Sequence, residues 1–195
     1  MKFTKIPETT FQNVQLNAGV LLKDFDPKTA TLEMADLLGA TSGGISFSAT
    51  PSYKDMGDDI DNCPKNTKEL KKLESLEIKL SGTFATVTAQ SAKMLAAHAD
   101  IDKADATHIV PRNDVAAEDF TDIWWVGDYS NENGDKNGGF VAIHMNNALS
   151  TGGFKIQSSD KEKGKFAFEF MAHVSITNQT EVPYEVYIKE GTAEA

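Results

Sequence analysis

Residues 165–176 read KFAFEFMAHVSI, with apolar and polar side chains at alternate positions. Such period-two alternation is typical of a β-strand with one buried and one solvated face. The apolar face of this strand is expected to carry Phe166, Phe168, Phe170, Val174 and Ile176. The polar face is expected to carry Lys165, Glu169, His173 and Ser175. This pattern favours an antiparallel sheet over a helical bundle.

The same alternation recurs at 45–50 and at 76–81, where Ile, Phe, Ala and Leu alternate with Ser, Thr, Glu and Lys. Further strands are expected at 14–22, 122–126, 140–145, 154–157 and 184–188. Segments 131–139 and 158–164 are rich in residues typical of turns, so they predict two hairpin tips. Most of the chain is therefore predicted to be β.

One segment, 88–99, breaks the strand rhythm. It is rich in good helix formers, and Ala92, Leu95, Ala96 and Ala99 recur at helical spacing. Thr88 is a suitable N-cap. A shorter helical turn is expected at 32–38. The expected fold class is mostly β with one α-helix, the helix lying across a β-sandwich or partial barrel.

The composition bounds the class of protein. The chain has 195 residues, a formal net charge of −10 and 40% hydrophobic residues, which suits one domain with an ordinary core. We expect a single domain over 14–190, an N-terminal arm at 1–13 and a C-terminal tail at 191–195. The single cysteine, Cys63, excludes an intrachain disulfide. No signal peptide or membrane span is expected, and the acidic balance disfavours nucleic-acid readers.

Enzyme signatures are missing from the sequence. There is no G-x-S-x-G motif, and the four histidines, His98, His108, His144 and His173, show no metal-ligand spacing. The segments 55–62 and 133–144 contain acidic and amide side chains but lack the order of a calcium loop. We therefore expect a protein that is not an enzyme and assign no catalytic, cofactor-binding or metal-binding residue.

An acidic run is followed at once by a lysine run. The acidic residues are Asp55, Asp58, Asp59 and Asp61, and the basic residues are Lys65, Lys68, Lys71 and Lys72. Such a segment is either a solvated loop or a contact in which the acidic part of one subunit faces the basic part of another. The second interpretation makes these eight residues candidates for a head-to-tail subunit interface.

Trp124 and Trp125 are adjacent, so on a strand they point to opposite faces. One is expected in the core. The other either packs beneath the helix or is presented outward, as a subunit-interface anchor or as a platform for a sugar. Both are candidate interface residues.

The order of these features resembles that of the major tail tube proteins of long-tailed bacteriophages. The likeness is carried by the strand GGISFSAT at 43–50, the acidic loop DDIDN at 58–62, the strand LEIKLSGT at 76–83 and the helix after it. With the Phe-rich hairpin near the C-terminus, it spans roughly residues 14–190.

The resemblance implies a β-sandwich flanked by a helix, six copies of which form a ring around a shared β-barrel. Stacked rings would form the tail tube, through which the tape-measure protein and genomic DNA pass. The partners of such a subunit would be other copies of the chain, the tape-measure protein, and the tail terminator and tail-tip proteins. The loop from Asp55 to Lys72 would contact neighbouring subunits, and both termini would be candidates for ring-to-ring contacts. The subunit would be located in the virion tail, which would be assembled in the host bacterial cytoplasm.

The resemblance also gives the acidic charge a role, because a net negative lumen would repel passing DNA. The polar sides of the strands, such as Ser46, Ser48, Thr50, Glu77 and Lys79, face either the lumen or the outside. Two other classes remain open, a calcium- or carbohydrate-binding β-sandwich module and a hydrolase on a β scaffold. The related tube of a contractile tail or secretion device also stays open.

Overall fold

The computed structural model describes residues 5–7, 10, 14–128 and 139–190. The strands are β1 (Leu16–Leu22), β2 (Thr41–Asp55), β3 (Lys71–Phe84), β4 (Ala99–Ile101), β5 (Ile109–Pro111), β6 (Thr121–Asp128), β7 (Phe140–Ser150), β8 (Phe166–Ala172) and β9 (Tyr184–Lys189). The α-helix of the described residues is α1 (Ala89–Ala96). Short 3₁₀ turns lie at Met34–Asp36, Lys68–Leu70, Ala117–Asp119 and Ile176–Asn178. The mostly β class with one helix is confirmed for these residues.

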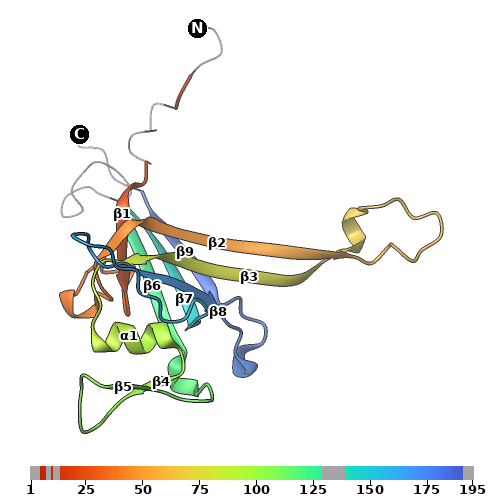
Figure 1. Cartoon of the computed structure of the whole chain (residues 1–195). Coiled ribbons are helices and arrows are strands. Elements are labelled where there is room, and N and C mark those ends of the chain that lie inside the picture. Colours follow the sequence, from red (N-terminus) through yellow and green to blue (C-terminus); the bar gives the residue numbers. More distant parts are fainter. Residues whose placement is uncertain (1–4, 8–9, 11–13, 129–138, 191–195) are drawn as a thin grey trace.

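The main sheet is antiparallel and follows the order β1-β6-β7-β8-β3-β2. One edge of β7 pairs with β6, whereas the other edge pairs first with β9 and then with β8. β9 occupies Phe140–Met145 of that edge, and β8 occupies Ala148–Ser150. The sheet therefore divides at β7 into two parts, β1-β6-β7-β9 and β8-β3-β2 (Figure 1). The described strands do not close into a barrel, because β1 and β2 remain open edges.

The main core lies between these two parts. Leu21, Ile123 and Met145 come from one part and meet Leu80 and Phe170 from the other, all nearly or fully buried. A second cluster lies on the opposite face of β1, β6 and β7 and contains Leu22, Phe25, Trp124 and Ala142. We call the side of the sheet that faces the main core its inner face.

The helix closes one end of the main core. Its side chain Leu95 is fully buried there, and Thr88 is the N-cap as predicted. The backbone N–H of Ser91 donates to Thr88 Oγ1 at 3.2 Å, and that of Thr88 donates to Ser91 Oγ at 2.8 Å. The helix ends at Ala96 rather than at 99, because Ala97 has a positive φ of 66°. No helix of the described chain is long and apolar enough to cross a bilayer.

The strand at 165–176 is confirmed in part. Phe166, Phe168 and Phe170 are buried, but Val174 and Ile176 are 57% and 83% exposed. β8 ends at Ala172, its partner Ala148 being the first residue of β7 that β8 reaches. Beyond that point β9 occupies the edge of β7, so the chain after Ala172 cannot continue along that edge. The expected placement of Val174 and Ile176 on the apolar face was wrong for this reason.

Other expectations need correction. The expected strand at 154–157 is reduced to a bridge between Gln157 and Lys165, which closes the predicted turn at 158–164. The expected helical turn at 32–38 is a single 3₁₀ turn. The small β4–β5 hairpin was not predicted, and β2 and β3 are much longer than expected. The predicted hairpin tip at 131–139 lies almost wholly outside the described residues.

Candidate functional site

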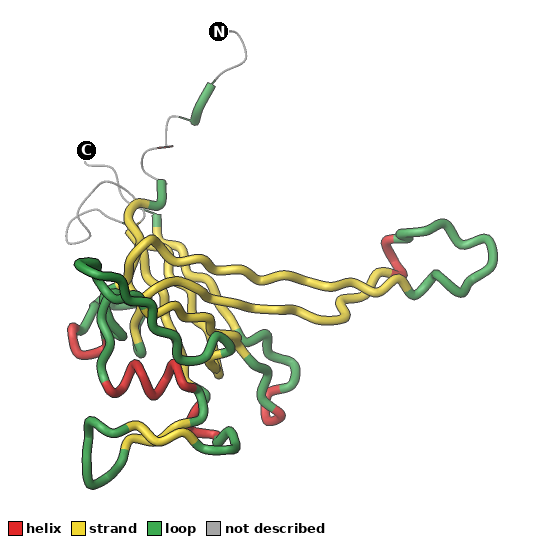
Figure 2. The backbone as a smooth tube through the Cα atoms, viewed as in Figure 1, coloured by secondary structure: helices red, strands yellow, loops and turns green. Residues whose placement is uncertain are grey.

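The longest feature of the fold is the hairpin made by β2 and β3. Its two strands run side by side away from the rest of the molecule and end in a loop far from the core (Figures 1 and 2). They stay paired from Ile45↔Gly82 out to Asp55↔Lys71. We call residues 51–76 the projecting hairpin and residues 55–71 its tip. The acidic run and the lysine run that follows it therefore lie at the end of a long hairpin.

The tip is folded around Asp55. Its Oδ1 accepts the backbone N–H of Gly57 at 3.0 Å, and its Oδ2 accepts that of Asn66 at 2.8 Å. These two hydrogen bonds hold the pKa of Asp55 below its ordinary value of 3.8, with Lys71 contributing in the same direction. A Cβ at Gly57 would lie 2.8 Å from Leu70 Cδ1 and 2.9 Å from Cys63 Sγ, so these two side chains would have to move to admit one. Asp55 is thus committed to holding the tip together.

The remaining charges of the candidate interface are presented to solvent. The exposed residues are Asp58, Asp59, Asp61, Lys65, Lys68, Lys71 and Lys72. Lys71 donates to Asn66 Oδ1 at 2.7 Å. Among the residues that the structure describes, no ion pair joins the acidic run to the lysine run. These charges are therefore available to a partner, and the head-to-tail contact stays a prediction.

The two tryptophans lie on opposite faces of β6, and one is in a core as expected. Trp124 is 7% exposed and stacks on His144, with ring centroids 4.0 Å apart and planes 8° from parallel. Trp125 is half-buried at the edge of the main core, and its indole N–H donates to Ala18 O at 2.9 Å. Its ring covers Gly19, where a Cβ would come within 2.5 Å of Trp125 Nε1. Whether either tryptophan anchors a subunit contact stays a prediction.

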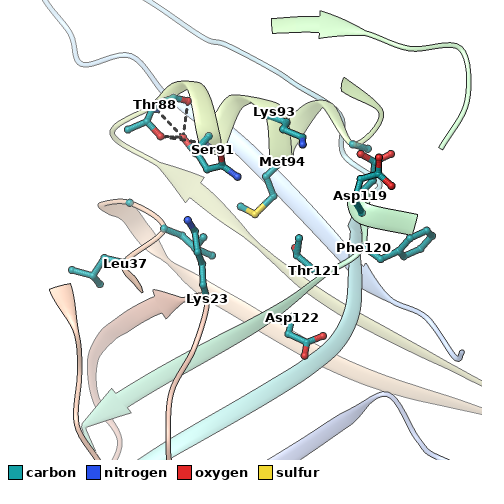
Figure 3. A pocket seen from close by; sticks show the side chains of 15 residues that line it. Lys23, Leu37, Thr88, Ser91, Lys93, Met94, Asp119, Phe120, Thr121 and Asp122 are labelled. Carbon is teal, nitrogen blue, oxygen red and sulfur yellow. Dashed lines mark hydrogen bonds between the residues drawn. The ribbon is translucent and has the colours of Figure 1, made fainter. Parts of the chain in front are cut away.

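A cavity of about 590 Å³ lies between α1 and the start of β6 (Figure 3). Leu37, Met94 and Phe120 contribute apolar lining, and Lys23 and Lys93 contribute cations. The hydroxyls of the helix N-terminus also line it, but they are engaged in the hydrogen bonds of the N-cap. These two hydroxyls, of Thr88 and Ser91, thus serve the helix end.

The buried carboxylate of that cavity is neutralised by an ion pair. The side chain of Asp119 is fully buried and accepts two hydrogen bonds from Arg112 Nη2, at 2.5 and 2.6 Å. The backbone N–H of Ala116 donates to the same carboxylate at 2.8 Å. The bond to Asp119 is the main cause that raises the pKa of Arg112. This pair ties the segment after β5 to the start of β6 and provides no free base.

A second, polar pocket of about 290 Å³ gathers groups that the sequence scatters. It is lined by His144, His173, Asp122, Glu181 and Ser175, among others. His144 Nε2 lies 3.5 Å from Asp122 Oδ2. The hydrolase interpretation expects histidine and carboxylates to converge in a pocket, and here they do. Their sequence separation gave no signal of this.

The pocket lacks the bond that would activate a nucleophile. Ser175 Oγ is paired with Thr177 Oγ1 at 2.7 Å rather than with either histidine in the described contacts. Serine hydrolases need the hydroxyl within reach of a base. The described residues also contain no group of three or more His, Cys, Asp or Glu able to hold a metal. Part of the second calcium candidate, 133–138, lies outside the described residues.

Sequence reasoning missed the apolar side chains exposed on β2, β3 and β9. Tyr53 and Leu73 on the projecting hairpin are each 56% exposed, and Val186 and Ile188 on β9 are 48% and 61% exposed. Their exposure depends on where the two parts of the sheet stop overlapping, which local alternation does not reveal.

No protein-family model matches the chain, and no curated protein matches it either.

Proposed function

We propose that the protein is a structural subunit of a phage tail tube, polymerising as stacked hexameric rings. The tube is a conduit for the tape-measure protein and for genomic DNA during ejection. In this proposal the chain assembles in the host bacterial cytoplasm and ends in the virion tail, with tail terminator and tail-tip proteins at the two ends of the tube.

The observation that carries the proposal is the open antiparallel sheet. β2 pairs with β3 alone and β9 with β7 alone among the described strands, so each has an unpaired outer edge. β2 has 15 residues, or about 50 Å of strand at about 3.3 Å per residue. An exposed edge of this length invites pairing with another chain. Closure into a barrel shared by several copies satisfies such edges.

The projecting hairpin supports the same proposal. A two-stranded ribbon that leaves the body of its own subunit has few contacts to stabilise it there. Its tip is nevertheless folded by Asp55, and its other charges are exposed. A neighbouring subunit gives both the ribbon and the charges a partner. The net charge of −10 suits a wall that must let DNA pass, and we propose that the lumen is net negative.

Negative-stain electron microscopy of the full chain over a concentration series tests this function. We expect rings or tubes of uniform diameter at high concentration. A dispersed monomer at every concentration contradicts the proposal. A melting temperature that rises with added calcium or a simple sugar, in a protein that stays monomeric, would instead favour the binding-module class.

A further inference from the structure

The inner side of the projecting hairpin stays apolar beyond the point where the core ends. On β2 the side chains that face the main core are Ile45, Phe47 and Ala49. The alternation along β2 continues to Pro51 and Tyr53, while the pairing with β3 shifts by one residue between Ser52 and Tyr53. Tyr53 lies directly opposite Leu73, and both are 56% exposed. A directly opposed apolar pair on a strand ribbon is a surface that packs against another sheet.

The other part of the sheet has the matching feature. On its inner face β9 contributes Tyr184 to the core and then presents Val186 and Ile188, which are 48% and 61% exposed. Val186 pairs with Ile143, and Ile188 pairs with Val141. Half-buried Trp125 continues this face on β6. We call Trp125, Val141, Ile143, Val186 and Ile188 the uncovered inner face.

The two surfaces are continuations of one sandwich. Within the chain, β2 and β9 touch where the rings of Phe47 and Tyr184 lie 5.6 Å apart. Past that contact β2 and β3 run away from β7 and β9 instead of along them (Figures 1 and 2). Within one chain, therefore, neither the apolar side of the projecting hairpin nor the uncovered inner face has a second layer packed on it. Sheet faces of this kind pack about 10 Å apart when a partner supplies the missing layer.

We propose that the projecting hairpin of one copy packs through Tyr53 and Leu73 onto the uncovered inner face of a second copy. The proposal rests on the proposed function and names the surface on the neighbour that receives the hairpin. The contact joins two different surfaces of the same chain, so it is heterologous and generates a ring when the rotation closes.

Charged side chains flank both surfaces. Lys54 and Lys72 lie directly opposite each other on the hairpin, one position from Tyr53 and Leu73 and therefore on the other face of the ribbon. Glu190 follows Ile188 by two positions, so an exposed carboxylate lies at the end of the uncovered inner face. The contact between the two copies is therefore apolar, with charges at its margins.

Assembly of surface variants tests the contact. Leu73→Ser and Ile188→Ser each remove an exposed apolar side chain, so neither disturbs the fold of the subunit. The matched control is Ile156→Ser, since Ile156 is 62% exposed against 61% for Ile188 and lies on neither surface. We expect each test variant to raise the concentration needed for rings or tubes at least about tenfold, with the control near the wild type. Equal assembly by all three variants overturns the proposal.

Cross-linking between chains tests the geometry independently. In a Cys63→Ser background, a Tyr53→Cys chain is mixed with an Ile188→Cys chain and treated with a short bismaleimide. We expect a heterodimer, and only background yield when Ile156→Cys replaces Ile188→Cys. Rings without this heterodimer overturn the hairpin contact but leave the tube proposal standing. The heterodimer without rings or tubes supports the contact and contradicts the tube.

Discussion

Gly19 is the position where one added methyl group most directly tests how Trp125 is held. Gly19 has a φ of +70°, and an added Cβ would lie 2.5 Å from Trp125 Nε1 and 2.6 Å from the backbone oxygen of Val126. The side chain of Trp125 can rotate away, but the backbone oxygen moves only if β6 moves. Gly19→Ala therefore displaces Trp125 and breaks the hydrogen bond from its indole N–H to Ala18 O.

The expected cost has two parts. A residue with a Cβ in the left-handed region costs about 1–2 kcal/mol. The lost hydrogen bond costs a further ~0.5–1.5 kcal/mol. Gly19→Ala should thus lower the free energy of unfolding by about 1.5–3.5 kcal/mol. Gly153→Ala is the matched control, because Gly153 has a φ of +69° but its Cβ would meet nothing within 4 Å. It should lose only the about 1–2 kcal/mol of the first part.

Urea unfolding followed by tryptophan fluorescence measures both variants against the wild type. We expect the Gly19→Ala midpoint to fall clearly below that of Gly153→Ala at an unchanged slope. Equal midpoints would refute the account of how Trp125 lies against β1. Because Trp125 belongs to the uncovered inner face, Gly19→Ala should also weaken self-assembly, whereas Gly153→Ala should not.

Three further predictions concern the helix, the hairpin tip and the charge. Thr88→Ala should lower the free energy of unfolding by about 1 kcal/mol, because the helix loses its N-cap. Thr88→Ser keeps a hydroxyl at the N-cap and should lose much less stability. Urea unfolding measures both variants. The pKa of Asp55 is held below 3.8, so its stabilisation of the tip is complete well above pH 3.8 and is lost as the pH falls through the lowered value. Protection of the Gly57 and Asn66 amides, measured by NMR relative to their intrinsic exchange rates at each pH, should fall over that acidic range in the wild type but show no such step in Asp55→Asn. Duplex DNA should not bind the protein at about 0.15 M salt in a fluorescence anisotropy titration, and tight binding there would contradict a net negative lumen.

The parts of the fold that local sequence determines were predictable. Alternation identified β8 with Phe166, Phe168 and Phe170 buried, and helix formers after Thr88 identified α1. The end of β8 was not predictable, because it depends on β9 occupying the edge of β7. The competing strand comes from a distant part of the chain, which local alternation does not reveal.

The candidate site was predictable in place but not in form. The charge runs located the tip of the hairpin, yet they did not reveal that Asp55 holds the tip together while the other acidic residues remain exposed. The stretch KKLES at 71–75 has one apolar residue, so it shows little alternation even though it extends β3. Leu73 forms an exposed apolar pair with Tyr53, which lies directly opposite it on β2. Such a pairing depends on register, which the sequence of a single strand does not contain.

Cryo-electron microscopy of the assembled protein is the most direct test of self-assembly through open sheet edges and the projecting hairpin. We expect stacked hexameric rings around a shared barrel, with Tyr53 and Leu73 of each copy packed on Val186 and Ile188 of the next. Concentrated protein that contains only separate monomers would contradict it.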